Sequence, residues 1–401
     1  MPILFDPARH EALAGAPWDE SAARGAIHAI VADTEAAMSP DITWPWHPLD
    51  AEGSRETEHK SLYLGAAGNL WALWTLRESG FAQPRVPPES RVAGLHDAYR
   101  ARPDTGTVVP SYLLGEAGIL LLQFRFTGSA LAADRLATAI GANHRNPSLE
   151  FLWGGPGTMV AASHMHVETG EERWKALWLE SAQVLWDAWQ PSGHAPCRLW
   201  MHDLYGRPKE VLGSGHGFAG NLHALLRGLS WWDEARRQEA LARCDETLRV
   251  TAMREEGVVN WPHGPDVKGR EKLLVQWCHG APGMITGLDA IPPGTSRALD
   301  ALLVAGGELT WRAGPLAKGP GLCHGTAGNG YAFLKLHRRT GDARWLERAR
   351  AFAMHAIAQS RAARETHGRG RHSLWTGDPG VAIYLRDCIT GSADWPTLDV
   401  F

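Results

Sequence analysis

Apolar residues recur at helical spacing in two alternating kinds of segment along this chain. In the first kind they form one stripe on an otherwise charged segment, as Trp174, Trp178 and Leu185 do. In the second kind they cover the whole segment, as at 69–76, 222–229 and 331–336. A helix with one apolar stripe faces solvent on its other side, whereas a helix that is apolar all round is buried. The pattern therefore predicts an all-α protein with outer and inner helices.

A Gly-x-x-Gly motif precedes each predicted inner helix and occurs seven times. Glycine permits tight turns and close approach of the backbone, both of which are needed where helices crowd around a centre. The first glycines of the motifs are 39 to 63 residues apart, and they are Gly65, Gly115, Gly154, Gly217, Gly280, Gly325 and Gly377. We predict one outer helix before each motif, near 25–38, 89–101, 129–142, 172–189, 233–252, 295–312 and 342–360.

Seven inner and seven outer helices can close into an α/α toroid, which is a double barrel. A chain of 401 residues exceeds the size at which one core usually divides into domains. A ring of repeats avoids this limit, because it grows by adding units around a centre and leaves no open end to cap. We therefore expect residues 1–401 to form a single toroid domain.

Composition excludes several classes of partner. The net charge is −4 with charges of both signs interspersed, so no basic surface is predicted for nucleic acid or for an anionic membrane. No signal-like segment follows the start MPILFDPARH, and no apolar run of about 18 residues occurs. The five cysteines are an odd number and form no dense framework, so reduced thiols are expected. These features predict a soluble cytoplasmic protein.

The fourth to sixth repeats carry candidate metal ligands. The residue before the first glycine is His216, His279 or His324, and in two of these repeats a cysteine, Cys278 or Cys323, precedes the histidine. Equivalent positions on adjacent repeats of a ring would bring both thiols to one metal. Two thiolates and one imidazole suit zinc and leave a fourth position open, as in a catalytic site that activates a thiol. The spacing leaves open whether His279 or His324 is the third ligand.

The segments GHGFAGN, WCHGAPG and GLCHGTAGNGYAFL closely resemble signature motifs of the LanC-like proteins, relatives of the lanthionine cyclases. The resemblance runs from about Gly213 to Leu385 and includes VNWP, LLVQWCHG and SLWTGDPG. It implies a ring of seven inner and seven outer helices, and one Zn²⁺ per chain held by Cys278, Cys323 and His324. It also implies that His216 is a catalytic acid and base. His279 would then lie beside the metal or face the substrate, as a second catalytic residue.

The same resemblance implies a substrate class. LanC-like proteins are associated with glutathione and with modified Ser or Thr in proteins, and this chain has His279 and Leu274 where cyclases typically carry Tyr and Arg. Lys318 matches a lysine used near the thiol substrate, and Arg369 and Arg371 lie where the family has a further arginine. The family's N-terminal arginine is not recognisable here, since Leu4 and Phe5 stand near its place and Arg9 is the nearest candidate. The resemblance therefore implies addition of glutathione or another thiol to dehydrated or phosphorylated peptide or protein substrates.

Three other functions have to be weighed against this one. A cyclase acting on a precursor peptide, or a protein that binds glutathione without turnover, would share the same motifs. A toroid glycosidase would need paired carboxylates, but Glu116, Glu150 and Asp378 stand in separate repeats. Among the 19 tryptophans, only Trp153, Trp277 and Trp375 adjoin the motifs and are candidates for substrate contact.

Overall fold

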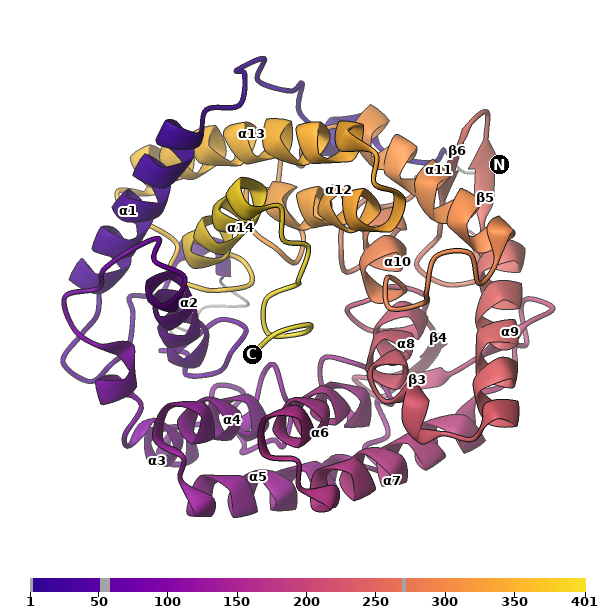
Figure 1. Cartoon of the computed structure of the whole chain (residues 1–401), viewed down its shortest axis with the longest axis horizontal. Helices are drawn as coiled ribbons and strands as arrows, with labels where there is room; N and C mark the ends of the chain where they lie inside the picture. The colour runs from indigo at the N-terminus through magenta and orange to yellow at the C-terminus, as the bar shows by residue number, and fades with distance from the viewer. Residues whose placement is uncertain (1–2, 51–57, 269–271) are drawn as a thin grey trace.

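The computed structural model describes residues 3–50, 58–268 and 272–401, and within them the α-helices form two concentric rings (Figure 1). The inner ring consists of α2 (Ala66–Glu78), α4 (Glu116–Thr127), α6 (Gly155–Thr169), α8 (Phe218–Arg227), α10 (Ala281–Gly287), α12 (Thr326–Thr340) and α14 (Asp378–Thr390). The outer ring consists of α1 (Glu20–Ala36), α3 (Leu95–Ala101), α5 (Ala130–Asn143), α7 (Glu172–Ala188), α9 (Glu234–Thr251), α11 (Arg297–Ala313) and α13 (Ala343–His367). The predicted α/α toroid of seven inner and seven outer helices is confirmed.

Helix boundaries differ from the predicted ones where a glycine interrupts the chain. The expected outer helix 89–101 is divided into a 3₁₀ turn, η3 (Pro88–Arg91), and α3, because Gly94 between them has a left-handed φ of 78°. The inner helix expected at 222–229 ends at Arg227. At Gly228 any side chain would overlap the Trp178 ring. Glycine at this position therefore allows the end of α8 to pack closely against the outer helix α7. The other short 3₁₀ turns are η1 (Pro7–Arg9), η2 (Pro48–Asp50) and η4 (Leu229–Trp231).

Both glycines of the repeated motif are required by close backbone contacts. The first glycine is the N-cap residue of its inner helix in all seven repeats. The second glycine lies one turn inside the helix, where a Cβ atom would overlap the carbonyl oxygen of the residue six positions earlier, as Gly328 would with Leu322. The motif thus presses each inner helix against the loop that leads into it.

Hydrogen bonds between motif loops close the ring. From the first repeat to the last, each loop is bonded to the next, and the last is bonded back to the first through the Trp375 N–H and the Tyr63 carbonyl, 3.2 Å apart. Three motifs continue as Gly-x-x-Gly-Asn, and their buried amides donate to a carbonyl of the preceding repeat: Asn69 to His372, Asn221 to Leu149 and Asn329 to Val275. Helix α1 also contacts α13, the last helix of the outer ring, so the outer ring closes as well.

The remaining elements are short hairpins and a central segment. The antiparallel pairs are β1 (Gln190–Pro191) with β2 (Arg198–Leu199), β3 (Met201–Leu204) with β4 (Arg207–Glu210), and β5 (Met253–Glu255) with β6 (Val258–Asn260). After α14 the chain turns into the centre of the ring (Figure 1). There Trp395 stacks on Trp277, and Asp399 pairs with the buried Lys335 at 2.5 Å. The core of the toroid is therefore filled.

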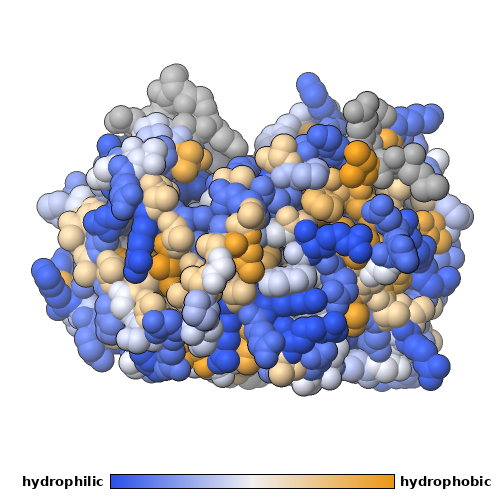
Figure 2. Space-filling view, turned by 90° about the horizontal axis from the view of Figure 1, so that it is seen from above, coloured by the Kyte–Doolittle hydropathy of each residue, from blue (hydrophilic) through white to orange (hydrophobic). Residues whose placement is uncertain are grey.

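The outer wall is a mixed surface. Figure 2 shows one side of it, where hydrophilic residues predominate and hydrophobic ones are scattered among them. Within the described ranges, the structure contains no helix with the length and apolar character that a membrane crossing requires.

Candidate metal centre

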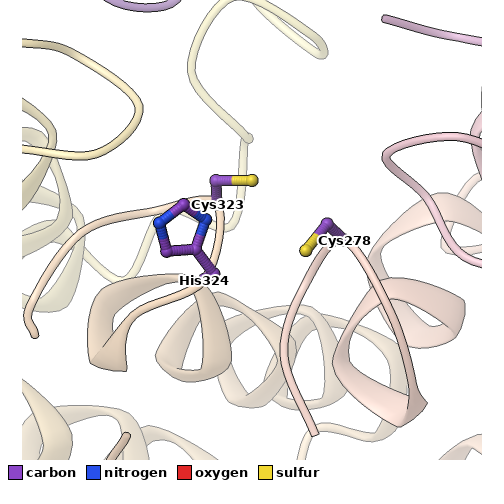
Figure 3. Close-up of side chains that lie close together, drawn as sticks. All are labelled: Cys278, Cys323 and His324. Atoms are coloured by element: carbon purple, nitrogen blue, oxygen red, sulfur yellow. The ribbon is translucent and has the colours of Figure 1, made fainter. Parts of the chain in front are cut away.

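Cys278, Cys323 and His324 meet at adjacent inner-helix entries. Cys278 lies in the loop before α10, and Cys323 and His324 lie in the loop before α12, with their side chains converging between the two loops (Figure 3). Their ligand atoms all lie within 4.8 Å of one another. Both cysteines are buried and the imidazole is half-buried. The expected convergence of residues 45 positions apart is therefore present.

Hydrogen bonds fix the two thiols in place. The Cys278 N–H donates to the Cys323 carbonyl at 3.2 Å, which ties the two loops together. The Gln276 amide donates to the Cys278 sulfur at 2.9 Å. The hydroxyl of the half-buried Tyr63 bonds the Cys323 sulfur, and desolvation raises the pKa of Tyr63, so it keeps its proton as a donor. Tyr63 lies in the first repeat and was not predicted as a site residue, because the sequence shows only that it begins a repeat motif and gives no sign of its contact with Cys323.

The pKa values of the two thiols shift in opposite directions. Their mutual hydrogen bond lowers the pKa of Cys278 well below its ordinary value, helped by His279 and His324, and raises the pKa of Cys323. One thiolate therefore forms readily, whereas the second needs a further positive charge to offset burial. A cation bound by both sulfurs would supply that charge.

The donor set fits zinc. Zinc takes thiolate sulfur at about 2.3 Å and imidazole nitrogen at about 2.0–2.1 Å, so tetrahedral ligands lie roughly 3.5–4 Å apart. The observed separations, all within 4.8 Å, need only a small inward movement of the side chains. Within the described ranges no other group of three or more His, Cys, Asp or Glu side chains could hold a metal.

His216 forms a pair with a buried carboxylate. Its Nδ1 lies 2.9 Å from Oε2 of Glu150, a fully buried residue in the loop before α6. Glu150 also accepts the N–H groups of Leu152 and Trp153 at 2.9 and 2.6 Å. Burial opposes protonation of His216, but the hydrogen bond and charge of Glu150, together with Cys278, outweigh it and raise the pKa of His216.

Glu150 is thus a site residue that the sequence did not reveal. In the sequence Glu150 is one of three isolated carboxylates beside the motifs. Nothing in the sequence indicates its hydrogen bond with a histidine 66 positions away. The one available signal was a lone carboxylate directly before FLWGGPG, an otherwise apolar repeat motif.

His279 does not join the three converging ligand atoms. Its Nδ1 lies 3.1 Å from Nδ1 of His263, so one ring donates to the other, and its ring stacks on that of His216 with centroids 6.4 Å apart. His263, in the loop after β6, was not predicted. The three imidazoles are thus in contact one after another, and the charges of His216 and His279 interact with that of Cys278.

Lys318 lies on the other side of the thiols, and its positive charge acts on Cys323. It lines a cleft of about 280 Å³ together with Arg369 and Arg371. Arg371 is bonded to Asp50 at 3.0 Å, and Arg369 donates to the Trp46 carbonyl at 3.2 Å. Lys318 is exposed and has no ion pair within the described part of the chain.

Arg9 lies near Lys318, although the two are far apart in the sequence. Its carbonyl accepts the Ala317 N–H at 3.0 Å, and its side chain is exposed. The main chain of the N-terminal segment therefore lies beside the loop that carries Lys318.

The three tryptophans beside the motifs separate into two groups. Trp277 and Trp375 are 2% and 0% exposed and pack against each other and Trp395, so they belong to the core. Trp153 is partly exposed, and its indole N–H donates to the Tyr205 hydroxyl at 3.3 Å. Only Trp153 is therefore placed to contact a ligand.

Comparison with known proteins gives one family. The model of the lanthionine synthetase C-like proteins matches residues 194–400, just over half of the chain. A Danio rerio protein named glutathione S-transferase LANCL1 is 32% identical over 229 residues, which is 55% of this chain and 53% of that protein. The Arabidopsis thaliana LanC-like protein GCL1 is 38% identical over 165 residues, which is 40% of this chain and 35% of that protein. The matches thus span about half or less of the length of these curated relatives.

A solved structure supports the fold. Nisin cyclase superposes with a TM-score of 0.64 over 92% of this chain and 94% of its own, with 14% sequence identity. At that identity the similarity concerns the architecture alone.

Proposed function

Because the chain belongs to the lanthionine synthetase C-like family, we propose that it is a zinc-dependent enzyme that forms carbon–sulfur bonds. The reaction is the addition of a thiol, glutathione first among the candidates, to a dehydrated Ser or Thr in a peptide or protein. The observation that carries this proposal is the convergence of Cys278, Cys323 and His324, supported by the donors that hold the two sulfurs.

Cys278, Cys323 and His324 would hold the metal in this proposal. When bound, zinc with two thiolates and one imidazole supplies a Lewis acid that allows a substrate thiol to be present as a nucleophilic thiolate near neutral pH. Tyr63 and Gln276 orient the two sulfurs through the hydrogen bonds described above. Cys244, buried in the outer helix α9, offers a matched cysteine outside the site.

His216 would move the proton that the addition requires. The thiol sulfur bonds the β-carbon of the dehydro residue, the carbon–carbon double bond becomes single, and the α-carbon takes up a proton, so the proton lost by the thiol balances the reaction. Glu150 holds Nδ1 of His216, which leaves Nε2 as the nitrogen that exchanges this proton. His279, stacked on His216, would face the substrate beside it.

The cleft at Lys318 would take the thiol substrate. Glutathione carries two carboxylates, and Lys318, which is exposed and has no ion pair with any residue that the structure describes, can bind one of them. Arg371 is already paired with Asp50, so its role is to shape the wall of the cleft, with Arg369 beside it. All five cysteines are free thiols, and we place the protein in the cytoplasm, where thiols stay reduced.

The test combines metal analysis with product detection. Purified protein should contain one zinc per chain and convert glutathione and a dehydroalanine peptide to a thioether that mass spectrometry detects. Cys323→Ala should lose both zinc and turnover, whereas Cys244→Ala should keep both. A wild-type protein that holds zinc and binds glutathione without any turnover would instead identify a binding protein. Turnover only with a cysteine inside the acceptor peptide would identify a cyclase.

A further inference from the structure

The β3–β4 hairpin stands beside His216 and has no part in the functions described so far. It lies between α7 and α8, and it borders a pocket of about 370 Å³ lined by Leu204, Tyr205, Arg207, Lys209, His216 and His263. This pocket lies on the Cys278 side of the site, where His216 and His279 are, whereas Lys318 acts on Cys323. The site is thus flanked by two separate clefts.

The hairpin pocket is cationic. Arg207 and Lys209 are two positions apart in β4, so both side chains project from the same face of the hairpin. Both are exposed, and neither has an ion pair among the residues that the structure describes. Glu210 is turned away from them and bonds Ser192 at 2.7 Å. An anionic ligand would find two unneutralised charges next to His216.

The tip of the hairpin is strained and aromatic. Tyr205 and Gly206 form its turn with φ angles of 56° and 73°, a conformation that favours Asn-Gly and that costs a bulky residue about 1 kcal/mol or more. Despite that cost, Tyr205 is 78% exposed. Its ring meets Trp153 edge-on with centroids 6.2 Å apart.

The aromatic pair is joined to the catalytic histidine. The Trp153 main-chain N–H donates to Glu150, which holds His216. Trp153 and Tyr205 also border a second depression, of about 400 Å³, and Tyr205 lines both depressions. The two rings therefore form a ridge between a cationic pocket and a second groove, a layout that suits an extended chain lying across the ridge.

We propose that the β3–β4 hairpin and Trp153 form the docking site of the acceptor polypeptide. The site takes a segment with an acidic side chain, carboxylate or phosphate, close to the reacting residue. Arg207 and Lys209 bind the anion, and the Trp153–Tyr205 ridge packs against a neighbouring side chain of the acceptor. This inference rests on the proposed function, since it names the acceptor class for the same site, and it assigns the Lys318 cleft to the thiol alone.

Binding of peptides that cannot react tests the inference separately from catalysis. Three fluorescein-labelled peptides carry alanine at the reacting position, flanked by aspartates, by phosphoserine or by asparagines. Fluorescence anisotropy with the wild-type protein should give a Kd about tenfold lower for the anionic peptides than for the asparagine peptide, with the difference shrinking as salt rises. The anionic peptide that binds more tightly identifies carboxylate or phosphate as the preferred group.

Variants then locate the binding. Replacing Arg207 and Lys209 together by glutamate should abolish the preference for anionic peptides. The matched pair Arg254→Glu and Arg297→Glu should keep it, because both residues are exposed, lie away from the hairpin and have no ion pair among the described residues. Equal Kd values for anionic and neutral peptides, or an equal loss in the matched pair, would overturn the inference.

A third variant tests the aromatic ridge without loss of the turn. Asparagine accepts the left-handed conformation, so Tyr205→Asn should keep or raise the thermal unfolding midpoint while weakening peptide binding several-fold. Unchanged peptide binding in this variant would refute the role of the ridge. Thioether formation on a neutral peptide, measured in parallel, reports on the proposed function whatever the binding result.

Discussion

Replacing Glu150 by glutamine removes one charge from the site at almost constant shape. The carboxylate is fully buried and lies 2.9 Å from Nδ1 of His216, and its other bonds come from the main-chain N–H groups of Leu152 and Trp153. Glutamine keeps one of the two oxygens, which can still accept from the Leu152 N–H and from His216, whereas the Trp153 N–H, bonded to the other oxygen, loses its acceptor. The largest electrostatic change is the loss of the charge that stabilises protonated His216.

The size of the effect follows from the negative charge that the hydrogen bond to His216 loses. A hydrogen bond to a charged group contributes about 1.5–3 kcal/mol, and one pKa unit corresponds to about 1.4 kcal/mol. In the wild type the pKa of His216 is raised because Glu150 outweighs burial. Without the charge, burial dominates, and the pKa of His216 should fall below its wild-type value. Above neutral pH the protonated fraction, and with it the rate, should fall about ten- to hundredfold.

The assay is the pH profile of kcat/KM for glutathione addition to a dehydroalanine peptide, with the spontaneous reaction subtracted. The high-pH limb should move to lower pH in Glu150→Gln, and part of the activity should return in mildly acidic buffer. Glu116→Gln is the matched control, because Glu116 pairs with His96 at 3.0 Å in the second repeat, outside the site. An unchanged midpoint in Glu150→Gln would refute the assignment of His216 as the proton donor.

Two further predictions concern stability. Burial tends to raise the pKa of Asp399, but Lys335 and His223 hold this pKa well below the usual range. The stabilisation of the folded state by ionised Asp399 is therefore present above about pH 4 and is lost as pH falls. Asp399→Asn should therefore lower the free energy of unfolding by about 3 kcal/mol at pH 7 and by less at pH 3, measured by urea unfolding. Asp394→Asn is the control, because Asp394 belongs to a half-exposed ion pair, and it should lower the free energy of unfolding by less than about 1 kcal/mol. Gly328→Ala should lower the thermal midpoint by several degrees, because its Cβ overlaps the Leu322 carbonyl, whereas Gly25→Ala, in open space on α1, should raise it slightly. Equal cost in both aspartate variants, or a stable Gly328→Ala, would contradict the packing described.

The sequence predicted the fold well because each repeat carries its own local signals. A stripe of apolar residues, a Gly-x-x-Gly motif and an apolar segment recur seven times, and each follows from contacts within about 40 to 60 residues. The errors were at helix boundaries, where a single glycine contact decides the end. Gly228 is such a case, since α8 ends where the Trp178 ring of the outer helix α7 leaves no room for a side chain.

The candidate site was predicted in part. Cys278, Cys323 and His324 stood out because equivalent positions in adjacent repeats carried the same residue types, and the ring brought their ligand atoms within 4.8 Å. Their role as zinc ligands and the role of His216 remain proposals. Arg371 was predicted as a substrate contact because it precedes a motif at the place where the family has an arginine. The structure pairs it with Asp50, 321 positions away in the chain, and the sequence does not reveal this partner.

What the sequence determined by itself is periodic: the helices, their order, the inner and outer faces, and the residues that repeat at equivalent positions. What only the tertiary structure decided is pairwise: Glu150 with His216, Tyr63 with Cys323, His263 with His279, and the hairpin beside them. The physical reason is that periodicity records burial, which each segment experiences separately, whereas a hydrogen bond depends on two side chains whose distance is set by closure of the whole ring.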